Sequence, residues 1–205
     1  MVQSALFPVE KLSMPTSDSI IVLRGATWAD YQRILELRDE RSLPRVAYLE
    51  GQLELMSPSL SHEVIKSMIS RLVETWCLEK GVEITAYGSW TQNSQESQRG
   101  VEPDECYVLG DNPEPSCCDL AIEVVWTSGG LDKLALYRKL GVRELWVWKD
   151  GELTLFKLTG DQHEPILASQ ALPGIDLEQL LGFVDIRPMT RAVRDYRAAL
   201  ATHRR

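Results

Sequence analysis

Several features are scarce in this sequence, and each scarcity argues against a class of protein. The 205 residues contain no apolar run long enough to span a membrane, which needs about 18 residues or more. The first twenty residues lack the basic segment followed by an apolar one that marks a secretion signal. We therefore expect a cytoplasmic protein. Neither an internal repeat nor a low-complexity segment is present, so a repeat architecture is not expected.

Cysteine and histidine are also few. The four cysteines are Cys77, Cys106, Cys117 and Cys118, and they form no Cys-x-x-Cys pair with a histidine nearby. This spacing argues against a structural zinc site. We expect reduced, partly buried thiols, since disulfides are uncommon in a protein of this size and compartment.

Positive charge is scarce except at the C-terminal end. The chain has 22 basic and 30 acidic residues, and its net charge of −8 argues against a broad positive surface for non-specific nucleic-acid binding. Residues 187–205 are the exception, with six arginines and one acid. These arginines are typical of the solvated face of an amphipathic helix, and phosphate contact is the more specific alternative. Similarly, Trp126, Trp146 and Trp148 favour packing over base stacking.

What remains is an ordinary globular composition, with 44% hydrophobic and 25% charged residues. The length suits one domain, 1–205. Within it we expect an irregular lead-in over 1–20, a folded core over 21–185 and a basic C-terminal helix over 187–205.

Apolar spacing and turn residues predict the elements of this core. Spacings of three and four predict helices, alternation and short apolar runs predict strands, and glycines mark the turns. The succession of strand, helix, strand and hairpin predicts a mixed sheet. The expected elements are a helix over 28–40, a hairpin of 45–49 and 52–56, a helix from Ser61 to Gly81, strands at 82–86, 106–109 and 120–126, a helix over 131–140, a hairpin of 144–148 and 152–158, and a terminal helix.

Glu123 interrupts the apolar strand expected over 120–126. Because side chains alternate along a strand, Glu123 shares its face with Ala121 and Val125, which are both apolar. A buried carboxylate is costly unless it is paired, neutralised or bound to a metal. Function is expected where a sequence breaks its own pattern, and we favour a functional role over a purely structural ion pair.

Asp104 is the natural partner of Glu123. It follows Pro103 and precedes the strand expected over 106–109, and Pro-Asp by itself is common turn chemistry. If the two strands are neighbours, both carboxylates can reach one divalent cation. Oxygen ligands of this kind suit Mg²⁺ or Mn²⁺, and such an ion can activate water against a phosphodiester.

A nearby cation would support that chemistry, and Lys133 is the candidate. It lies in the first turn of the helix expected over 131–140, where its charge opposes the helix dipole at a cost of about 0.3–1 kcal/mol. The simpler interpretation is a solvated surface lysine.

These motifs together resemble the Uma-two family of restriction endonucleases in the PD-(D/E)XK nuclease superfamily. The resemblance runs from about Tyr48 to about Leu158. It depends on YLEGQLELMSPSLSHEVI, EPDECYVLG and DLAIEVVWTSGGLDKLALYRKLGVRELWVW, in that order.

The resemblance implies an α/β (α+β-like) restriction-endonuclease-like fold, in which a mixed central sheet is flanked by helices and 21–185 is the endonuclease-like core. It implies that Asp104 and Glu123 are metal ligands. The lysine that usually follows the second acid by two residues is replaced here by Val125, and Lys133 matches the family's lysine in the following helix. Glu54 and His62 match the family's hairpin acid and helix-opening histidine. Without the family, Glu54 would be expected to face solvent and His62 to be a simple cap residue.

The resulting hypothesis is a Mg²⁺- or Mn²⁺-dependent endonuclease that hydrolyses DNA phosphodiester bonds. A homodimer is one assembly open to it, since many enzymes that cut both strands act as dimers. A rival hypothesis is a nuclease-fold protein that has lost catalysis and kept a binding or regulatory role, which Val125 and the acidic net charge favour. A third is that Glu123 merely pairs with Lys133.

Overall fold

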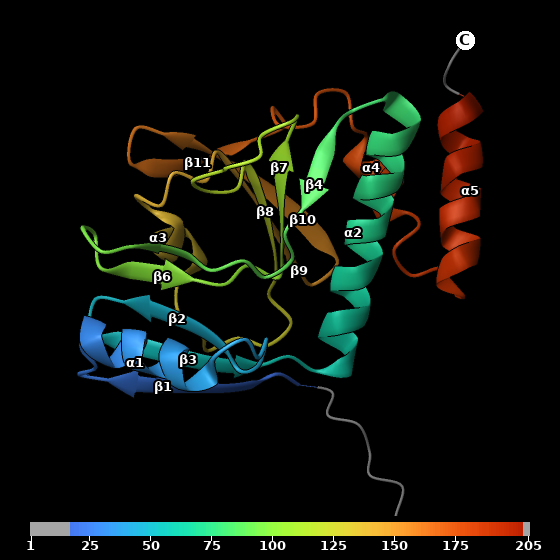
Figure 1. Ribbon diagram of the computed structural model, residues 1–205. Coiled ribbons are helices and arrows are strands. Elements are labelled where there is room, and N and C mark those ends of the chain that lie inside the picture. Colours follow the sequence, from blue (N-terminus) through green and yellow to red (C-terminus); the bar gives the residue numbers. More distant parts are fainter. Residues whose placement is uncertain (1–16, 203–205) are drawn as a thin grey trace, which may run out of the picture.

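Two β-sheets meet in the computed structural model, which describes residues 17–202 (Figure 1). The larger sheet has six strands in the order β11-β10-β9-β8-β7-β4. β8 and β9 run parallel and every other neighbouring pair is antiparallel. The predicted mixed central sheet is therefore confirmed. Its strands are β4 (Ile84–Ala86), β7 (Glu105–Leu109), β8 (Leu120–Val124), β9 (Glu144–Lys149), β10 (Glu152–Thr159) and β11 (Gln162–Ile166).

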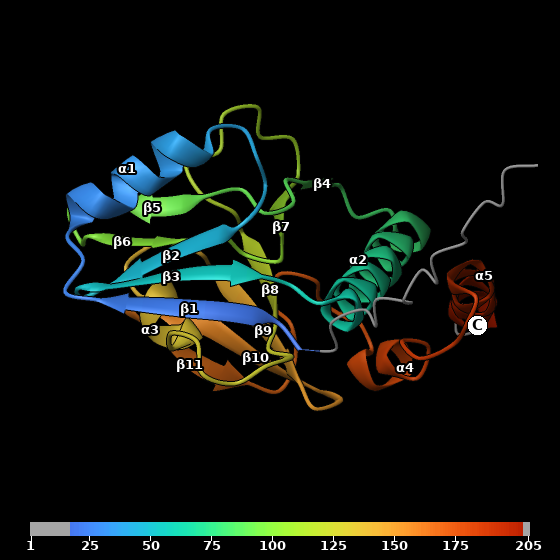
Figure 2. The ribbon, with the colours of Figure 1, turned by 90° about the horizontal axis from the view of Figure 1, so that it is seen from below.

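The smaller sheet is wholly antiparallel, in the order β1-β3-β2-β6-β5 (Figure 2). Its centre is the predicted hairpin, in which Glu50 and Gly51 both adopt positive φ to form the tight turn. Its strands are β1 (Ser19–Arg24), β2 (Arg45–Leu49), β3 (Gln52–Ser57), β5 (Gln92–Ser94) and β6 (Arg99–Val101).

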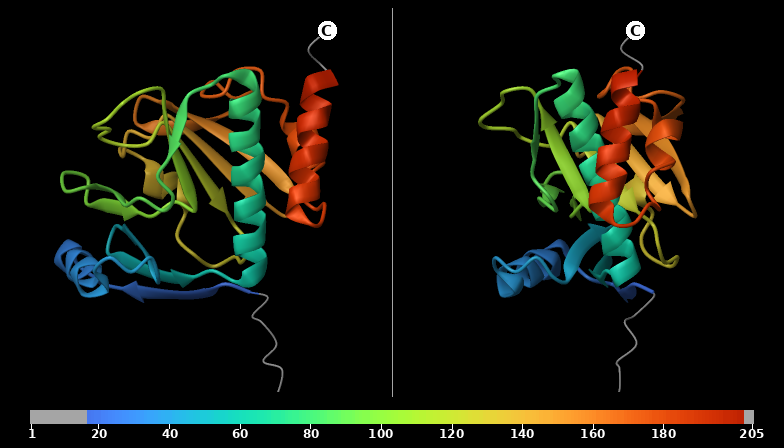
Figure 3. Two further views of the ribbon diagram at one scale, coloured as in Figure 1. Left: turned by 45° about the vertical axis from the view of Figure 1, so that its right-hand side comes forward. Right: turned by 90° about the vertical axis from the view of Figure 1, so that its right-hand side faces the viewer.

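The long helix α2 (Leu60–Lys80) covers one face of the larger sheet. The Ser59 side chain accepts a hydrogen bond from the backbone N–H of His62 and caps the start of α2, and Gly81 ends it in the left-handed conformation. Apolar residues of α2 pack against β8 and against α4 (Leu177–Leu181) and α5 (Met189–Thr202). Figure 3 shows α2 and α5 side by side. Neither α2 nor any other helix in residues 17–202 has the length and apolarity that a bilayer crossing requires.

The opposite face of the larger sheet packs against α3 (Lys133–Tyr137) and the inner strands of the smaller sheet. Helix α1 (Trp28–Arg38) covers the smaller sheet at β2. Its start is a capping box, because Thr27 and Asp30 exchange hydrogen bonds. All four cysteines are free thiols, as predicted.

Some predicted bounds were wrong. The helix expected over 131–140 is only α3, which begins after its cap residue Asp132 and ends where Arg138 leaves helical geometry with a ψ of 130°. β1 begins at Ser19, inside the segment 1–20 that we expected to be irregular, and residues 1–16 lie outside the described residues. The strand β1 and the short elements β5, β6, β11 and α4 were not predicted. The strands β5, β6 and β11 are largely polar, lack a periodic apolar pattern and depend on pairing with neighbours.

A buried ion pair fastens α1 to the smaller sheet. The Arg38 guanidinium binds both carboxylate oxygens of Glu102. Glu102 also accepts hydrogen bonds from the Thr91 hydroxyl and the Val46 N–H, each at 2.8 Å. Three segments that are distant in the sequence are thus joined at one carboxylate.

We expect Glu102→Gln to lower the free energy of unfolding by about 3–5 kcal/mol, because it leaves a buried arginine without its counter-charge. The matched control is Glu50→Gln at the ion pair with Arg99. The Glu50 side chain is 74% exposed, against 3% for Glu102, so the control should lose less than about 1 kcal/mol. Urea denaturation measures both, and equal losses would contradict this account.

Candidate active site

The pairing of β7 with β8 places Asp104 beside Glu123. In this antiparallel ladder Glu105 pairs with Ile122 and Cys106 with Ala121. Asp104 lies one residue before β7, and the Val124 N–H donates a hydrogen bond to its Oδ2, so Asp104 stands at the end of this ladder beside Glu123. The strands next to the two predicted carboxylates are therefore neighbours. The two side chains turn to different helices, Asp104 to α2 and Glu123 to α3.

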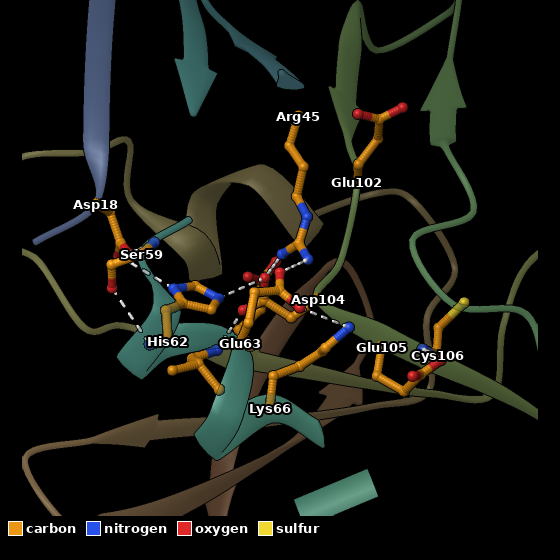
Figure 4. Close-up of polar contacts among 12 residues, drawn as sticks. Asp18, Arg45, Ser59, His62, Glu63, Lys66, Glu102, Asp104, Glu105 and Cys106 are labelled. Carbon is orange, nitrogen blue, oxygen red and sulfur yellow. Dashed lines mark hydrogen bonds and ion pairs between the residues drawn. The ribbon is translucent and has the colours of Figure 1, made fainter. Parts of the chain in front are cut away.

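Asp104 is 1% exposed and has partners on both carboxylate oxygens. Oδ2 accepts a hydrogen bond from the Val124 N–H at 2.6 Å. Oδ1 lies 2.9 Å from His62 Nε2 and also contacts the Arg45 guanidinium (Figure 4). Arg45, at the start of β2, reaches Glu63 Oε1 at 3.1 Å as well. Helix α2 and the smaller sheet thus both converge on Asp104.

His62 lies between two carboxylates. Its Nδ1 is 3.1 Å from Asp18 Oδ2 and its Nε2 faces Asp104 Oδ1. Burial lowers the pKa of His62 and outweighs the opposing effect of Asp18. The ring is fully buried, and Figure 4 shows it bridging the two aspartates. His62 is therefore more than a cap residue, since its side chain links β1 to the Asp104 carboxylate.

Glu123 is 1% exposed and is held by α3. The Tyr137 hydroxyl donates a hydrogen bond to Oε1 at 2.7 Å, and Lys133 Nζ lies 3.1 Å from Oε2. Burial, with the negative Glu123 nearby, raises the pKa of Tyr137 well above its usual value, so the phenol stays a donor. Lys133 occupies the first turn of α3, as predicted.

Glu54 does not face solvent, and the expectation drawn from strand alternation alone was wrong. It is 3% exposed, because the loop that joins β8 to α3 covers it. Its Oε2 accepts a hydrogen bond from the Leu131 N–H at 2.6 Å. A Cβ added at Gly130 would lie 2.6 Å from that same oxygen, so alanine at 130 would force the Glu54 carboxylate to shift and disturb its hydrogen bond to the loop. Glu54 thereby fixes the loop just before Lys133.

A small pocket opens beside these groups. Its volume is about 160 Å³, and its walls come from β1, β3 and the loop between β8 and α3. Asp18, Glu54, Val125 and Lys133 line it, together with residues 128–131. The Lys133 side chain is 18% exposed, so its ammonium can meet a ligand in the pocket.

The two carboxylates fit a divalent cation in a limited way. Asp104 Oδ1 and Glu123 Oε2 are buried and are in contact with charged or ring-nitrogen groups of the chain, Oδ1 with Arg45 and His62 and Oε2 with Lys133. A cation at these oxygens would replace or share those partners, and Mg²⁺ is commonly held by one or two carboxylates with water completing the shell. In residues 17–202 no group of three or more His, Cys, Asp or Glu side chains could hold a metal ion. The donor set therefore suits a largely hydrated ion.

The structure divides the predicted residues into two adjoining groups. Asp104 and His62 meet on the α2 side, whereas Glu123 and Lys133 meet on the α3 side, and Glu54 supports the second group through its loop. The catalytic and ligand roles of all five stay predictions.

Three side chains at this site were missed. Tyr137 lies four residues after Lys133, and that helical spacing could have indicated their shared face. Arg45 opens an otherwise apolar strand, which could have suggested a buried charge. Asp18 lies in the segment expected to be irregular, where no sequence pattern pointed to it.

We expect Gly130→Ala to lower the free energy of unfolding by about 1–3 kcal/mol, since the new methyl group would collide with Glu54. In a Glu54→Ala background the same substitution should cost much less. Urea denaturation of the two single variants and the double variant gives the coupling. Additive effects would show that the contact between Glu54 and the loop does not govern position 130.

This chain is similar to a known protein family and to a solved structure. The family model Uma2, described as "Putative restriction endonuclease", matches residues 28–190. Among solved structures, a crystal structure of "a putative nuclease belonging to DUF820 from Anabaena variabilis ATCC 29413" is similar with a TM-score of 0.48 and 14% sequence identity, over 85% of this chain and 99% of that chain. No curated protein matches this chain significantly. All five predicted site residues fall within 28–190, whereas Asp18 precedes that range.

Proposed function

Since the chain belongs to the Uma2 (Uma-two) family, we propose that it is a nuclease that hydrolyses DNA phosphodiester bonds with a divalent cation held by Asp104 and Glu123. The observation that carries the proposal is the pair of buried carboxylates where β7 and β8 meet, Asp104 just before β7 and Glu123 in β8, each with a hydrogen bond on one oxygen and a basic side chain on the other. Mg²⁺ or Mn²⁺ suits such oxygen ligands. When bound, the ion would polarise the phosphodiester and supply an activated water.

The surrounding side chains prepare the two carboxylates for this role. The Val124 N–H and the Tyr137 hydroxyl each occupy one oxygen and so orient the other. Lys133 supports the negative charge that develops on the phosphate, since its ammonium faces both Glu123 and the pocket. Val125 stands in the usual lysine position and carries no charge. Lys133 supplies the positive charge instead.

Arg45 is set to compete with the cation. Its guanidinium already contacts Asp104 Oδ1, the oxygen assigned to the ion. Because guanidinium and Mg²⁺ carry like charges, an ion held at that oxygen would leave Arg45 with Glu63, its second partner.

The same contacts favour a second candidate function, a binding or regulatory protein without catalysis. Asp104 is already paired with Arg45, and Glu123 with Lys133, so both charges are compensated by the chain itself. On this alternative the Glu123–Lys133 pair is structural and nucleic acid binds without being cut. Glu123→Gln would then destabilise the fold by leaving a partly buried lysine without its counter-charge.

Purified protein should nick or linearise supercoiled plasmid DNA in Mg²⁺ or Mn²⁺ but not in excess chelator. Asp104→Asn and Glu123→Gln should abolish cleavage, because each removes the charge of one ligand. Lys133→Met should reduce the cleavage rate by about 10²–10³-fold, a loss typical of one charge-stabilising group. Agarose gel electrophoresis measures the rates, and circular dichroism checks that each variant is folded.

The matched control is Asp111→Asn, which makes the same chemical change at an exposed acid in the loop between β7 and β8. It should cleave like the parent protein. Cleavage that persists in a folded Asp104→Asn variant would refute the assignment. A parent protein that binds DNA but cuts neither DNA nor RNA with any divalent metal would favour the second candidate function.

A further inference from the structure

The carboxylate of Asp18 is the least expected part of this site. It comes from the segment just before β1, outside the residues that match the family model. Its side chain is nevertheless 3% exposed, at the wall of the pocket. Asp18 was not among the predicted site residues. It needs partners inside the structure, because an unpaired buried carboxylate is costly.

Both oxygens of Asp18 have defined partners. Oδ1 accepts a hydrogen bond from the Ser59 N–H at 2.8 Å, at the first turn of α2. Oδ2 lies 3.1 Å from His62 Nδ1. Burial alone would raise the pKa of Asp18, but the hydrogen bond from Ser59 and the contact with His62 outweigh it, and the pKa is lowered. Asp18 is therefore an acceptor at both contacts.

The main chain of Asp18 is also anchored. Its N–H donates a hydrogen bond to Thr127 Oγ1 at 2.8 Å, in the loop that leads to Lys133. Asp18 thus joins β1, the start of α2 and the loop after β8, which are the three segments around the pocket. This anchoring restricts how the carboxylate can turn.

Both ring nitrogens of His62 face carboxylate oxygens, but a neutral imidazole carries only one N–H. Only one of the two carboxylates can therefore accept a hydrogen bond from the neutral ring. If Asp18 accepts the proton on Nδ1, the lone pair of Nε2 faces Asp104 Oδ1 at 2.9 Å. Two acceptors that face each other in a buried site need a cation beside them, a place that the Arg45 guanidinium takes at Oδ1 and that the proposed metal ion would take when bound.

We propose that Asp18 is a positioning residue for the site: it accepts the Nδ1 proton of His62 and thereby directs the Nε2 lone pair toward Asp104 Oδ1 and the cation held there. A carboxylate behind a histidine in this way fixes both the tautomer and the orientation of the ring. The cation belongs to the proposed function, on which this inference rests, whereas the tautomer of His62 can be measured without any metal.

The test uses two substitutions with opposite expectations. In Asp18→Asn the amide oxygen can still accept from the Ser59 N–H, which places the amide NH₂ against His62 Nδ1. The NH₂ group donates, so His62 should switch to the tautomer protonated at Nε2. Ser59→Ala is the control, because it removes the side-chain cap of α2 and the hydrogen bond between the Ser59 hydroxyl and Asp18 but keeps the backbone N–H that binds Asp18. It should leave the His62 tautomer unchanged.

Nitrogen NMR of the metal-free protein labelled at histidine nitrogen reads the tautomer, and His62→Gln assigns the signal. His163 is an internal reference, because its Nε2 lies 2.9 Å from the Val142 carbonyl, which can only accept a proton. The expected result is Nδ1–H for His62 in the parent protein and Nε2–H in Asp18→Asn. Nε2–H in the parent protein, or the same tautomer in both, would overturn the proposal.

Calorimetric titration with Mn²⁺ adds a second measurement. Asp18→Asn should weaken Mn²⁺ binding by about 10–100-fold, as is typical when the partner of a site histidine is lost. Ser59→Ala should not weaken it. Equal Mn²⁺ affinity in Asp18→Asn and the parent protein, with binding lost in Asp104→Asn, would also overturn the proposal.

If the parent protein does not bind Mn²⁺, the cation of the proposed function fails, and the tautomer measurement alone decides whether Asp18 positions His62. The failure of the proposed function and the failure of this inference are therefore distinguishable.

Discussion

The pairing of β7 with β8 is the interaction on which the candidate site depends. It brings Asp104 beside Glu123, and the Val124 N–H completes the arrangement by binding Asp104 Oδ2. Both carboxylates lie beyond reach of bulk water, so their charges interact strongly with whatever surrounds them. Helix α2 and α3 then supply basic and hydrogen-bonding groups from opposite sides, and each group acts on a carboxylate that the ladder has already placed.

The chain balances these charges within the site. Arg45 and Lys133 each contact one of the two acids, and Glu63 offers Arg45 a second partner. A site built in this way can fold with its carboxylates ionised before any ligand arrives, since the cost of burying each charge is offset by its partner. Replacement of Arg45 or Lys133 by a bound metal ion would then require only a local rearrangement of side chains.

The sequence predicted part of this arrangement well. Glu123 was identified by a physical contradiction, a carboxylate within an apolar strand, and its burial follows from the same alternation that revealed it. Helix α2 and the two hairpins were found because their periodicity and turn glycines are local signals. The family resemblance added Glu54 and His62, whose local patterns indicated only a surface strand and a cap.

Other parts depend on contacts between distant segments, which a single sequence does not record. Strand alternation assigned Glu54 to solvent because it cannot foresee that the loop around Gly130 covers the hairpin. The length of α3 was overestimated, since the apolar spacing over 131–140 does not show that the backbone leaves helical geometry at Arg138. Asp18 left no trace in composition or spacing, because its role arises only where β1 meets α2 and the loop at Thr127.

β1 and the neighbouring Asp18 precede the residues that match the family model, yet they contribute to the candidate site. Similarity to the family starts at residue 28, so a shortened chain that followed that boundary would retain every acid, lysine and histidine that the motifs identify. It would nevertheless remove the edge strand paired along β3 and expose the far side of the His62 ring to solvent. The limits of sequence similarity therefore cut through the candidate site, and activity measured on such a fragment would describe an incomplete site.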